Sequence, residues 1–151
     1  TRAVGGPKKM EWHVVRNLAP QNIARLKAIT AGASRLELPK ALRPACHQSD
    51  VGFSNVYGRM SWDKPSPTIT GGCTTLSKGR FGHPSALRTI SVREAAMLQT
   101  FPADYIFDTE FIDRACIIIG NALPATFAKT MADVCARKLR DKENEQSTDR
   151  E

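Results

Sequence analysis

The pattern of apolar and polar positions divides the chain into three zones. In the first zone, Ile23, Leu26 and Ile29 follow Pro20 at intervals of three residues, and Gly32 comes after them. Proline favours the first turn of a helix and glycine favours its end, so a short helix is predicted to begin at the proline. The basic, glycine-containing residues 1–12 predict a loose segment. Residues 34–55 show no sustained period and predict irregular structure, which leaves room for short strands.

The second zone, residues 56–88, lacks helical spacing and is divided by glycine and proline. The stretches NVYGRMSW, residues 55–62, and TIT, residues 68–70, are rich in residues that favour strands. DKPSP between them favours a turn, and a glycine-punctuated loop, GGCTTLSKGRFGHP, follows. This zone therefore predicts short β-strands joined by turns.

Helical patterns return in the third zone. Ser91 and Glu94 form an S-x-x-E capping box, which predicts a helix over 92–100 that ends before Pro102. A second helix is predicted between about 109 and 120, and Pro124 begins the last one. The apolar stripe of the last helix consists of Phe127, Met131, Val134, Cys135 and Leu139. The residues after it, 140–151, hold no apolar side chain and predict a disordered, charged tail.

Basic residues outnumber acidic residues in the body of the chain. The 151 residues include 22 lysines and arginines against 15 aspartates and glutamates, for a net charge of +7. The last twelve residues hold three basic and five acidic groups, so the preceding residues carry 19 basic groups against 10 acidic ones. A body this basic favours a polyanionic partner such as nucleic acid.

Cysteine spacing and hydropathy limit the alternatives. The cysteines, at 46, 73, 116 and 135, contain no C-x-x-C pair, so the pattern predicts neither a metal site nor a disulfide framework, and we expect reduced thiols. The sequence suggests no membrane span and no signal peptide. We expect a cytoplasmic protein of bacterial or phage type, associated with the nucleoid.

Three motifs in a fixed order carry a more specific signal. They are GRMSWDKPSPTITGG, GRFGHPSALRTISVREAAMLQTFPADYIF and IGNALPATFAKTMADVCARKL. Together they resemble the C-terminal part of DNA (cytosine-5)-methyltransferases, in which P-x-P-T-I-T, R-E-A-A-x-L-Q-[ST]-F-P and I-G-N-A-V-P-P occur in this order. The resemblance extends from Tyr57 to about Leu139, and the middle motif is the most specific.

The resemblance implies methyl transfer from S-adenosylmethionine to carbon 5 of cytosine in duplex DNA. The family uses the thiolate of a Pro-Cys pair, which adds to carbon 6 of the ring, and the carboxylate of Glu-Asn-Val. The residues before the four cysteines here are Ala, Gly, Ala and Val, and the only Glu-Asn pair lies in the charged tail. We therefore assign no catalytic residue, and we expect an inactive chain that is a fragment or the small subunit of a split enzyme. The alternative is a stand-alone DNA-binding or regulatory module.

The resemblance also implies an α+β fold with three parts. Residues 1–107 are expected to form a small, mostly antiparallel β target-recognition domain that includes the helical scaffold motif. Residues 108–139 are expected to form a helical segment that packs on an α/β S-adenosylmethionine-binding domain not contained in this chain. Residues 140–151 are expected to be the disordered tail.

Site residues follow from the same resemblance. Thr70, the second threonine of TIT, is expected to donate its hydroxyl to the DNA backbone beside the flipped cytosine. Asn121 and Ala122 are expected beside S-adenosylmethionine, although Ile118 replaces a glutamine that the family usually has there. Arg93 and Glu94 are expected to be structural. The other expected DNA contacts are Arg59, Lys64, Thr68, Lys78 and Arg80.

Purely structural roles remain as alternatives for two of these assignments. The threonines at 68 and 70 are also ordinary strand residues, and Asn121 also suits the end of a helix. The sequence does not assign the residues that recognise the bases of the target.

Overall fold

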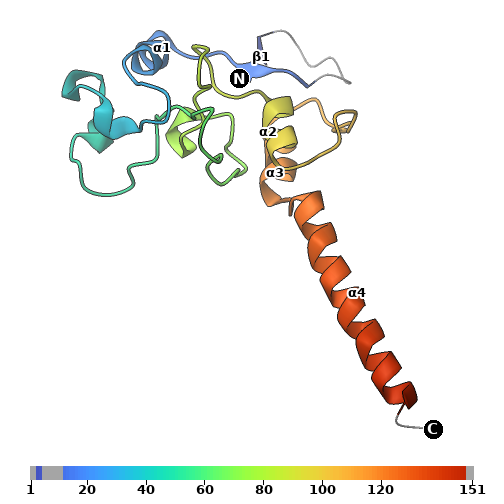
Figure 1. Ribbon diagram of the computed structural model, residues 1–151. Helices are drawn as coiled ribbons and strands as arrows, with labels where there is room; N and C mark the ends of the chain where they lie inside the picture. The colour runs from blue at the N-terminus through green and yellow to red at the C-terminus, as the bar shows by residue number, and fades with distance from the viewer. Residues whose placement is uncertain (1–2, 5–11, 149–151) are drawn as a thin grey trace.

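The computed structural model describes the fold of residues 3–4 and 12–148, with side chains from residue 12 to residue 142. It shows a folded body and one long C-terminal helix that extends away from it (Figure 1). The predicted loose segment at residues 1–12 lies mostly outside the described residues.

Four helices appear where the sequence predicts them. α1, Pro20–Lys27, begins at the proline, and Gly32 lies in the turn beyond it with a φ of +86°. α2 is Val92–Leu98, α3 is Ile112–Asn121 and α4 is Ala125–Thr148. The capping box of α2 is confirmed, because the Ser91 hydroxyl accepts from the Glu94 backbone N–H and the Glu94 carboxylate accepts from the Ser91 N–H.

The core lies where α2 packs against α3. The small residues Ala95, Ala96 and Ala115 are fully buried, so that the two helices approach closely, and larger apolar side chains fill the space around them. The beginning of the body joins this core through its backbone. The Trp12 carbonyl accepts from the Arg93 N–H, and the Trp12 ring meets Phe107 edge-on at 5.7 Å.

The middle zone contains far less β structure than the sequence predicts. In the described residues, the paired strands are β1, Ala3–Val4, and β2, Val15–Arg16, which are antiparallel. Residues 68–70 form no strand, and residues 55–62 contribute only an isolated bridge between Arg59 and Gly82. Both strand predictions are therefore wrong. Single turns of 3₁₀-helix occur at Arg35–Glu37, Lys40–Leu42, Ala45–His47 and Leu76–Lys78.

Buried arginines hold this zone together in place of strand pairing. The Arg59 guanidinium donates to the carbonyls of Leu26, His83, Pro84 and Ala86. Buried backbone carbonyls need donors, and one guanidinium offers five N–H groups in a fixed plane. Segments that are far apart in sequence are therefore joined without a ladder. The sequence pattern cannot predict these arginine hydrogen bonds, because they join residues that are far apart in the chain.

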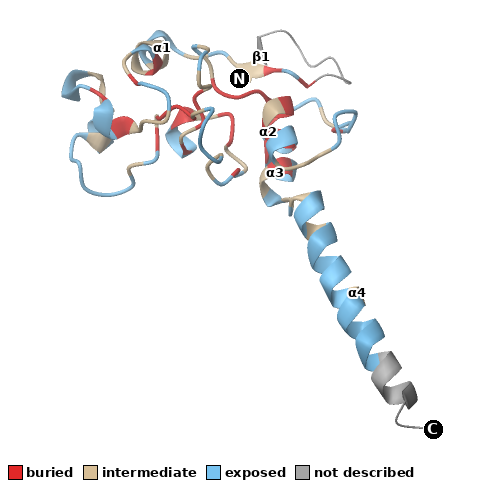
Figure 2. Cartoon of the chain, in the orientation of Figure 1, coloured by how far each residue is buried: buried red, intermediate tan, exposed pale blue. Residues whose placement is uncertain are grey.

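α4 differs from the prediction in its length. The sequence predicts an end near Leu139, but the helix continues to Thr148. Residues 140–148 contain no proline or glycine and are rich in Arg, Lys, Glu and Gln, which have high helix propensity. The end of the predicted tail, residues 149–151, lies outside the described residues. Most of α4 is exposed along its described length (Figure 2).

The stretch Ile112–Lys142 has the length and composition of a membrane span, contrary to the expectation from the sequence. It consists of α3 and α4 with a break between Asn121 and Ala125. The apolar side chains of α3 that are buried, among them Ile112 and Ile119, contribute to the protein core. Core packing accounts for these residues of α3, whereas the apolar stripe of α4 is exposed.

Candidate nucleic-acid interface

The TIT segment presents its two threonines to solvent. Thr68 and Thr70 are exposed, while Ile69 between them is buried in the core. The Thr70 hydroxyl accepts from the Gly72 N–H at 3.3 Å, and the Thr70 carbonyl accepts from the Cys73 N–H at 3.0 Å. A buried isoleucine therefore anchors the segment and a tight turn directs the Thr70 hydroxyl, although no strand forms.

Helix α3 packs directly on this segment through Gly120. A Cβ atom at Gly120 would lie 2.1 Å from the Gly71 nitrogen and 2.2 Å from the Thr70 carbonyl carbon. Only a residue without a side chain permits this approach. The structure thereby brings together the expected DNA contact at Thr70 and the expected cofactor-side residues at 121 and 122. The sequence motifs that contain them are about fifty residues apart.

Gln99 holds the end of α3, a role that the sequence analysis missed. Its side-chain amide donates to the carbonyls of Ile119 and Ala122 at 3.1 and 3.2 Å. The last carbonyls of a helix have no partner within it, so this amide acts as a cap. The glutamine of the L-Q-[ST]-F-P motif was the available signal, because such a side chain supplies two donors.

The residues expected beside S-adenosylmethionine lie at the end of α3, where Ala122 is the C-cap. Asn121 is exposed at the end of α3, and Ala122 is half-buried. An exposed amide that offers both a donor and an acceptor fits a polar edge of that cofactor. Among residues 12–142, no cluster of three or more His, Cys, Asp or Glu is placed to hold a metal ion.

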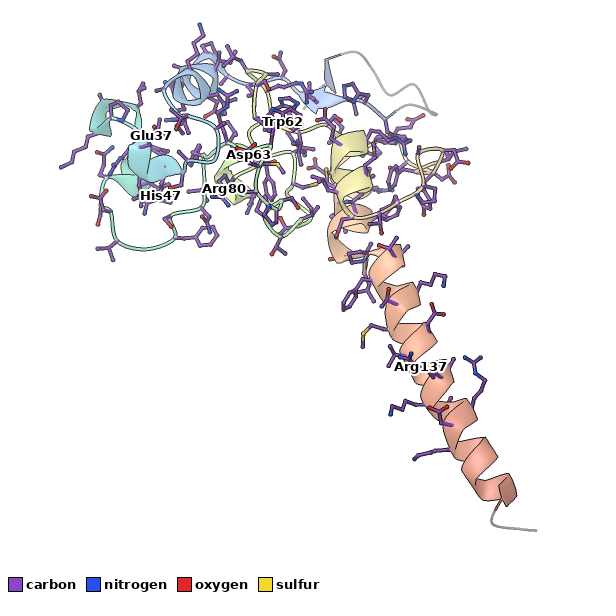
Figure 3. All side chains as sticks on the ribbon, in the orientation of Figure 1. Glu37, His47, Trp62, Asp63, Arg80 and Arg137 are labelled. Atoms are coloured by element: carbon purple, nitrogen blue, oxygen red, sulfur yellow. The ribbon has the colours of Figure 1, made fainter. Side chains whose placement is uncertain are left out.

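The expected cations fall into two groups. Lys78 is exposed, and its side chain lies over Gly72, where an added Cβ would be 2.7 Å from the lysine Cγ. Lys64 and Arg80 both lie near Gly32 instead, and Arg80 donates to the Gly32 carbonyl at 3.2 Å. Lys78 is therefore the cation that the structure brings next to the TIT turn. Figure 3 shows Arg80 in the body, away from Arg137 on α4.

Arg59 occupies a position that does not fit a phosphate contact. It is 8% exposed, and its N–H groups donate to the backbone carbonyls described above. Its charge serves the fold, so we leave it out of the proposed interface.

Arg93 lies on the core side of α2, and the next residue, Glu94, is half-buried. Arg93 is buried, donates to the carbonyls of Pro102 and Tyr105, and lies over the Phe107 ring. Glu94 forms two hydrogen bonds with the Arg88 guanidinium, at 2.7 and 2.8 Å. These contacts tie α2 to the loops on either side of it.

We expect Glu94→Gln to lower stability at neutral pH and to flatten its acid dependence. Burial alone would raise the pKa of Glu94, but hydrogen bonds from Arg88 and from the Ser91 N–H outweigh it and lower the pKa from 4.5 to about 2. A lowered folded-state pKa gives stability that is present above the unfolded value and is lost as the pH falls toward 2. Urea midpoints at pH 7 and pH 3 test this. Equal pH dependence in both proteins would contradict it.

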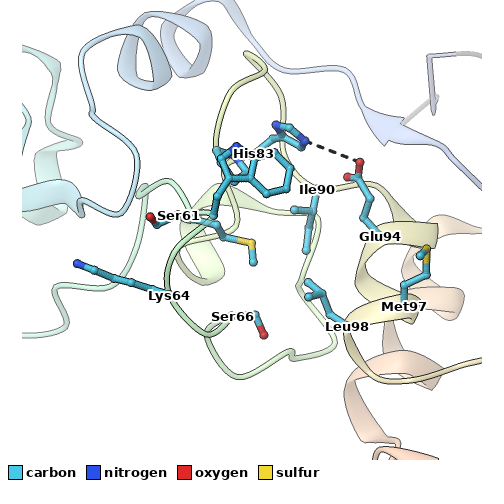
Figure 4. A pocket seen from close by; sticks show the side chains of 11 residues that line it. Ser61, Lys64, Ser66, His83, Ile90, Glu94, Met97 and Leu98 are labelled. Atoms are coloured by element: carbon cyan, nitrogen blue, oxygen red, sulfur yellow. Dashed lines mark ion pairs between the residues drawn. The ribbon is translucent and has the colours of Figure 1, made fainter.

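A pocket of about 450 Å³ opens beside this region (Figure 4). His83 lies on one side and α2 on the other, with Lys64 also in the lining. The Trp62 ring, which also lines the pocket, meets the His83 ring edge-on at 5.5 Å. Met97 and Leu98 line the pocket from α2 and are 57% and 41% exposed. The pocket thus combines apolar side chains with polar ones, and one of its lining residues, Ser66, lies two positions before Thr68 in the chain.

The exposed threonine hydroxyls and the exposed Lys78 lie at a turn that Gly120 braces. A family model described as C-5 cytosine-specific DNA methylase matches residues 8–137. The chain belongs to the C-5 cytosine-specific DNA methylase family. Members of this family use S-adenosylmethionine as methyl donor.

Several curated proteins are similar to this chain. The type II methylase M.HgiDII of Herpetosiphon aurantiacus is 39% identical over 84% of this chain and 37% of its own length. DNA (cytosine-5)-methyltransferase 1 of Mus musculus is 39% identical over 52% of this chain and 5% of its own length. The type II methyltransferase M.AquIB of a Picosynechococcus strain is 29% identical over 82% of this chain and 85% of its own length. The chain thus spans little more than a third of the first of these relatives.

Proposed function

We propose that this chain is the DNA-recognition part of a DNA (cytosine-5)-methyltransferase, and that the catalytic part lies outside these residues. The observation that carries the proposal is the contact of Gly120 with the Thr70–Gly71 backbone. This contact supports the proposal because it links the hydroxyl expected to face DNA with the end of α3 that is expected to face the cofactor. A protein that only binds DNA has no need for this coupling.

The catalytic thiolate has to come from elsewhere. None of the four cysteines follows a proline, and Cys73 and Cys116 are fully buried. The catalytic part is then either a further region of the same polypeptide or a separate subunit.

Within this arrangement the chain would hold and position DNA. The Thr70 hydroxyl would donate to a phosphate beside the flipped cytosine, and Lys78 would supply positive charge next to it. Flipping a base costs a few kcal/mol, so a clamp on the distorted backbone offsets part of that cost. Asn121 would form one polar wall for S-adenosylmethionine, which supplies the methyl group when bound.

The exposed apolar face of α4 would dock on the catalytic part. Phe127 and Met131 are 54% and 50% exposed on one side of the helix, and Val134 continues that side. Apolar area of this kind is stabilised when a partner removes it from water. A stand-alone module would gain nothing from such a helix, so the stripe favours the half-enzyme.

We expect the chain to bind duplex DNA weakly, with an affinity that falls steeply as salt increases, because bound lysines and arginines release counterions from DNA. Thr70→Ala should reduce methylation in the presence of the catalytic part by about tenfold or more, with under a threefold loss of simple DNA affinity, because the hydroxyl supports the flipped state. Fluorescence anisotropy and transfer of labelled methyl groups measure the two effects.

Thr70→Ser is the matched control, since it keeps the hydroxyl and should retain most of the activity. Salt-independent binding would contradict the nucleic-acid interface as a whole. Equal activity of Thr70→Ala and the unmodified chain would remove Thr70 from the proposed clamp.

A further inference from the structure

A fully buried arginine organises the loop that follows the 3₁₀ turns. Arg35 is 0% exposed, and its guanidinium donates to the carbonyls of Ser49, Val51 and Phe53 at 2.7, 3.1 and 3.0 Å, with a longer bond of 3.4 Å to His47. Removing a guanidinium from water costs several kcal/mol unless hydrogen bonds replace its hydration. This loop supplies that replacement, so the loop and the arginine hold each other in place.

The four carbonyl acceptors of Arg35 belong to alternate residues of the loop, and this arrangement holds the loop backbone against the guanidinium. Carbonyls of every second residue, from 47 to 53, converge on one guanidinium. The side chains of Val51 and Phe53 are left 85% and 64% exposed. Gly52 between them has a φ of +93°, which favours glycine, and its side is open. Arg43 braces the loop further, with bonds to the Leu36 and Leu38 carbonyls and to Asp50.

Val51 and Phe53 differ from other exposed apolar residues in the support of the backbone beneath them. Single exposed apolar residues are common on protein surfaces and need no explanation. Here, however, a buried charge is used to hold the backbone beneath them. The loop lies at the end of the body opposite to α4, so the docking proposed for α4 leaves it free (Figure 1). Lys40 is exposed beside the loop, since its carbonyl accepts from the Gln48 side chain, and the Asp50 carboxylate is paired with Arg43. The lysine therefore suits a polyanionic partner.

The edges of the bases limit what such side chains can recognise. In the major groove, guanine, adenine and cytosine present hydrogen-bond donors and acceptors, and the C5-methyl of thymine is the apolar group. An apolar tip that enters this groove therefore gains most from contact with thymine. Serine or asparagine at the same positions would have no such preference.

We propose that Val51 and Phe53 are specificity-determining residues that contact a thymine methyl group in the major groove, with Arg35 as the positioning residue for their loop. This inference rests on the proposed function as a DNA-recognition part. It adds that the preferred DNA sequence contains at least one A·T pair recognised through its methyl group.

Base preference in a pool of random duplexes tests the assignment, with the chain combined with its catalytic part. The unmodified protein should prefer thymine at one or two positions. Val51→Ser or Phe53→Ser should lower this preference by about fourfold or more, because burial of one methyl group contributes about 0.8 kcal/mol. The affinity for unrelated duplexes and its salt dependence should stay within about twofold, since the phosphate contacts are unchanged.

Uracil in place of the preferred thymine removes only the methyl group. The unmodified protein should bind the uracil duplex about fourfold more weakly, whereas the variant that lost the preference should bind both duplexes equally. Phe111→Ser is the matched control, because Phe111 is 61% exposed but precedes α3. It should leave the thymine preference intact.

The possible failures are distinct. A protein that binds no duplex DNA overturns the proposed function as well as this inference. Sequence-specific binding without a thymine preference, an unchanged preference in both loop variants, or indifference of the unmodified protein to uracil overturns the inference alone. Because Val51 and Phe53 are surface residues, their replacement by serine leaves the core intact.

Discussion

Replacement of Gly120 by alanine is expected to destabilise the body by at least about 3 kcal/mol, at the upper end of the range for overpacked sites. In an open helix the same change is stabilising by up to about 1 kcal/mol, because alanine has the higher helix propensity. At this position the new methyl group would lie 2.1 and 2.2 Å from backbone atoms of Gly71 and Thr70. Backbone cannot move aside as a flexible side chain can, so either α3 or the threonine turn must shift. Urea unfolding measures the loss.

The activity of Gly120→Ala with the catalytic part should fall together with its stability, because the displaced turn carries the Thr70 hydroxyl. For stability, Gly52→Ala is the control with the same chemical change. Nothing lies within 4 Å of its added Cβ, and its φ of +93° leaves only backbone strain, so the expected loss is about 1 kcal/mol. A Gly120→Ala protein as stable as the unmodified one would show that α3 and the turn are not in firm contact.

Met131→Asp is expected to abolish methyltransferase activity reconstituted with the catalytic part, with a loss of more than about a hundredfold, while the body remains as stable as before. The isolated chain itself should transfer no methyl group. Met131 is 50% exposed on α4, outside the core, so the substitution removes nothing that stabilises the body. In a docked interface the new carboxylate would be buried without a partner, which costs several kcal/mol. Labelled methyl transfer and urea unfolding measure the two effects.

Ala136→Asp introduces the same charge on the other side of α4, about 140° around the helix axis. It should retain most of the activity. If Met131→Asp restored full activity with the catalytic part, α4 would not dock there, and the stand-alone module would be favoured.

The helices of this protein follow from its sequence. The capping box of Ser91 and Glu94, the prolines at 20 and 124 and the spacing of apolar residues are local signals, and each helix begins within a few residues of the predicted position. A helix satisfies its own backbone, so neighbouring residues largely suffice to predict it. The end of α4 was predicted less well. A stretch rich in charged residues is typical of exposed helices and also of disordered tails, so its composition does not distinguish the two.

The middle zone and the site depended on contacts that neighbouring residues do not reveal. Residues with a preference for strands, such as 68–70, form a strand only if a partner strand lies beside them. No partner strand lies beside these residues. The position of Gly120 against Thr70 and Gly71 joins motifs that are separate in sequence.

The sequence by itself determined the family, the helices, the motif order and the net charge of +7. Only the tertiary structure decided how the positive charge is used. Arg35, Arg59 and Arg93 are buried and donate to backbone carbonyls, whereas Lys64 and Lys78 are exposed. A buried arginine and an exposed lysine contribute the same formal charge. The N–H groups of the buried arginine, however, already donate to backbone carbonyls of the fold. Composition counts charges, and burial determines which of them a phosphate can reach.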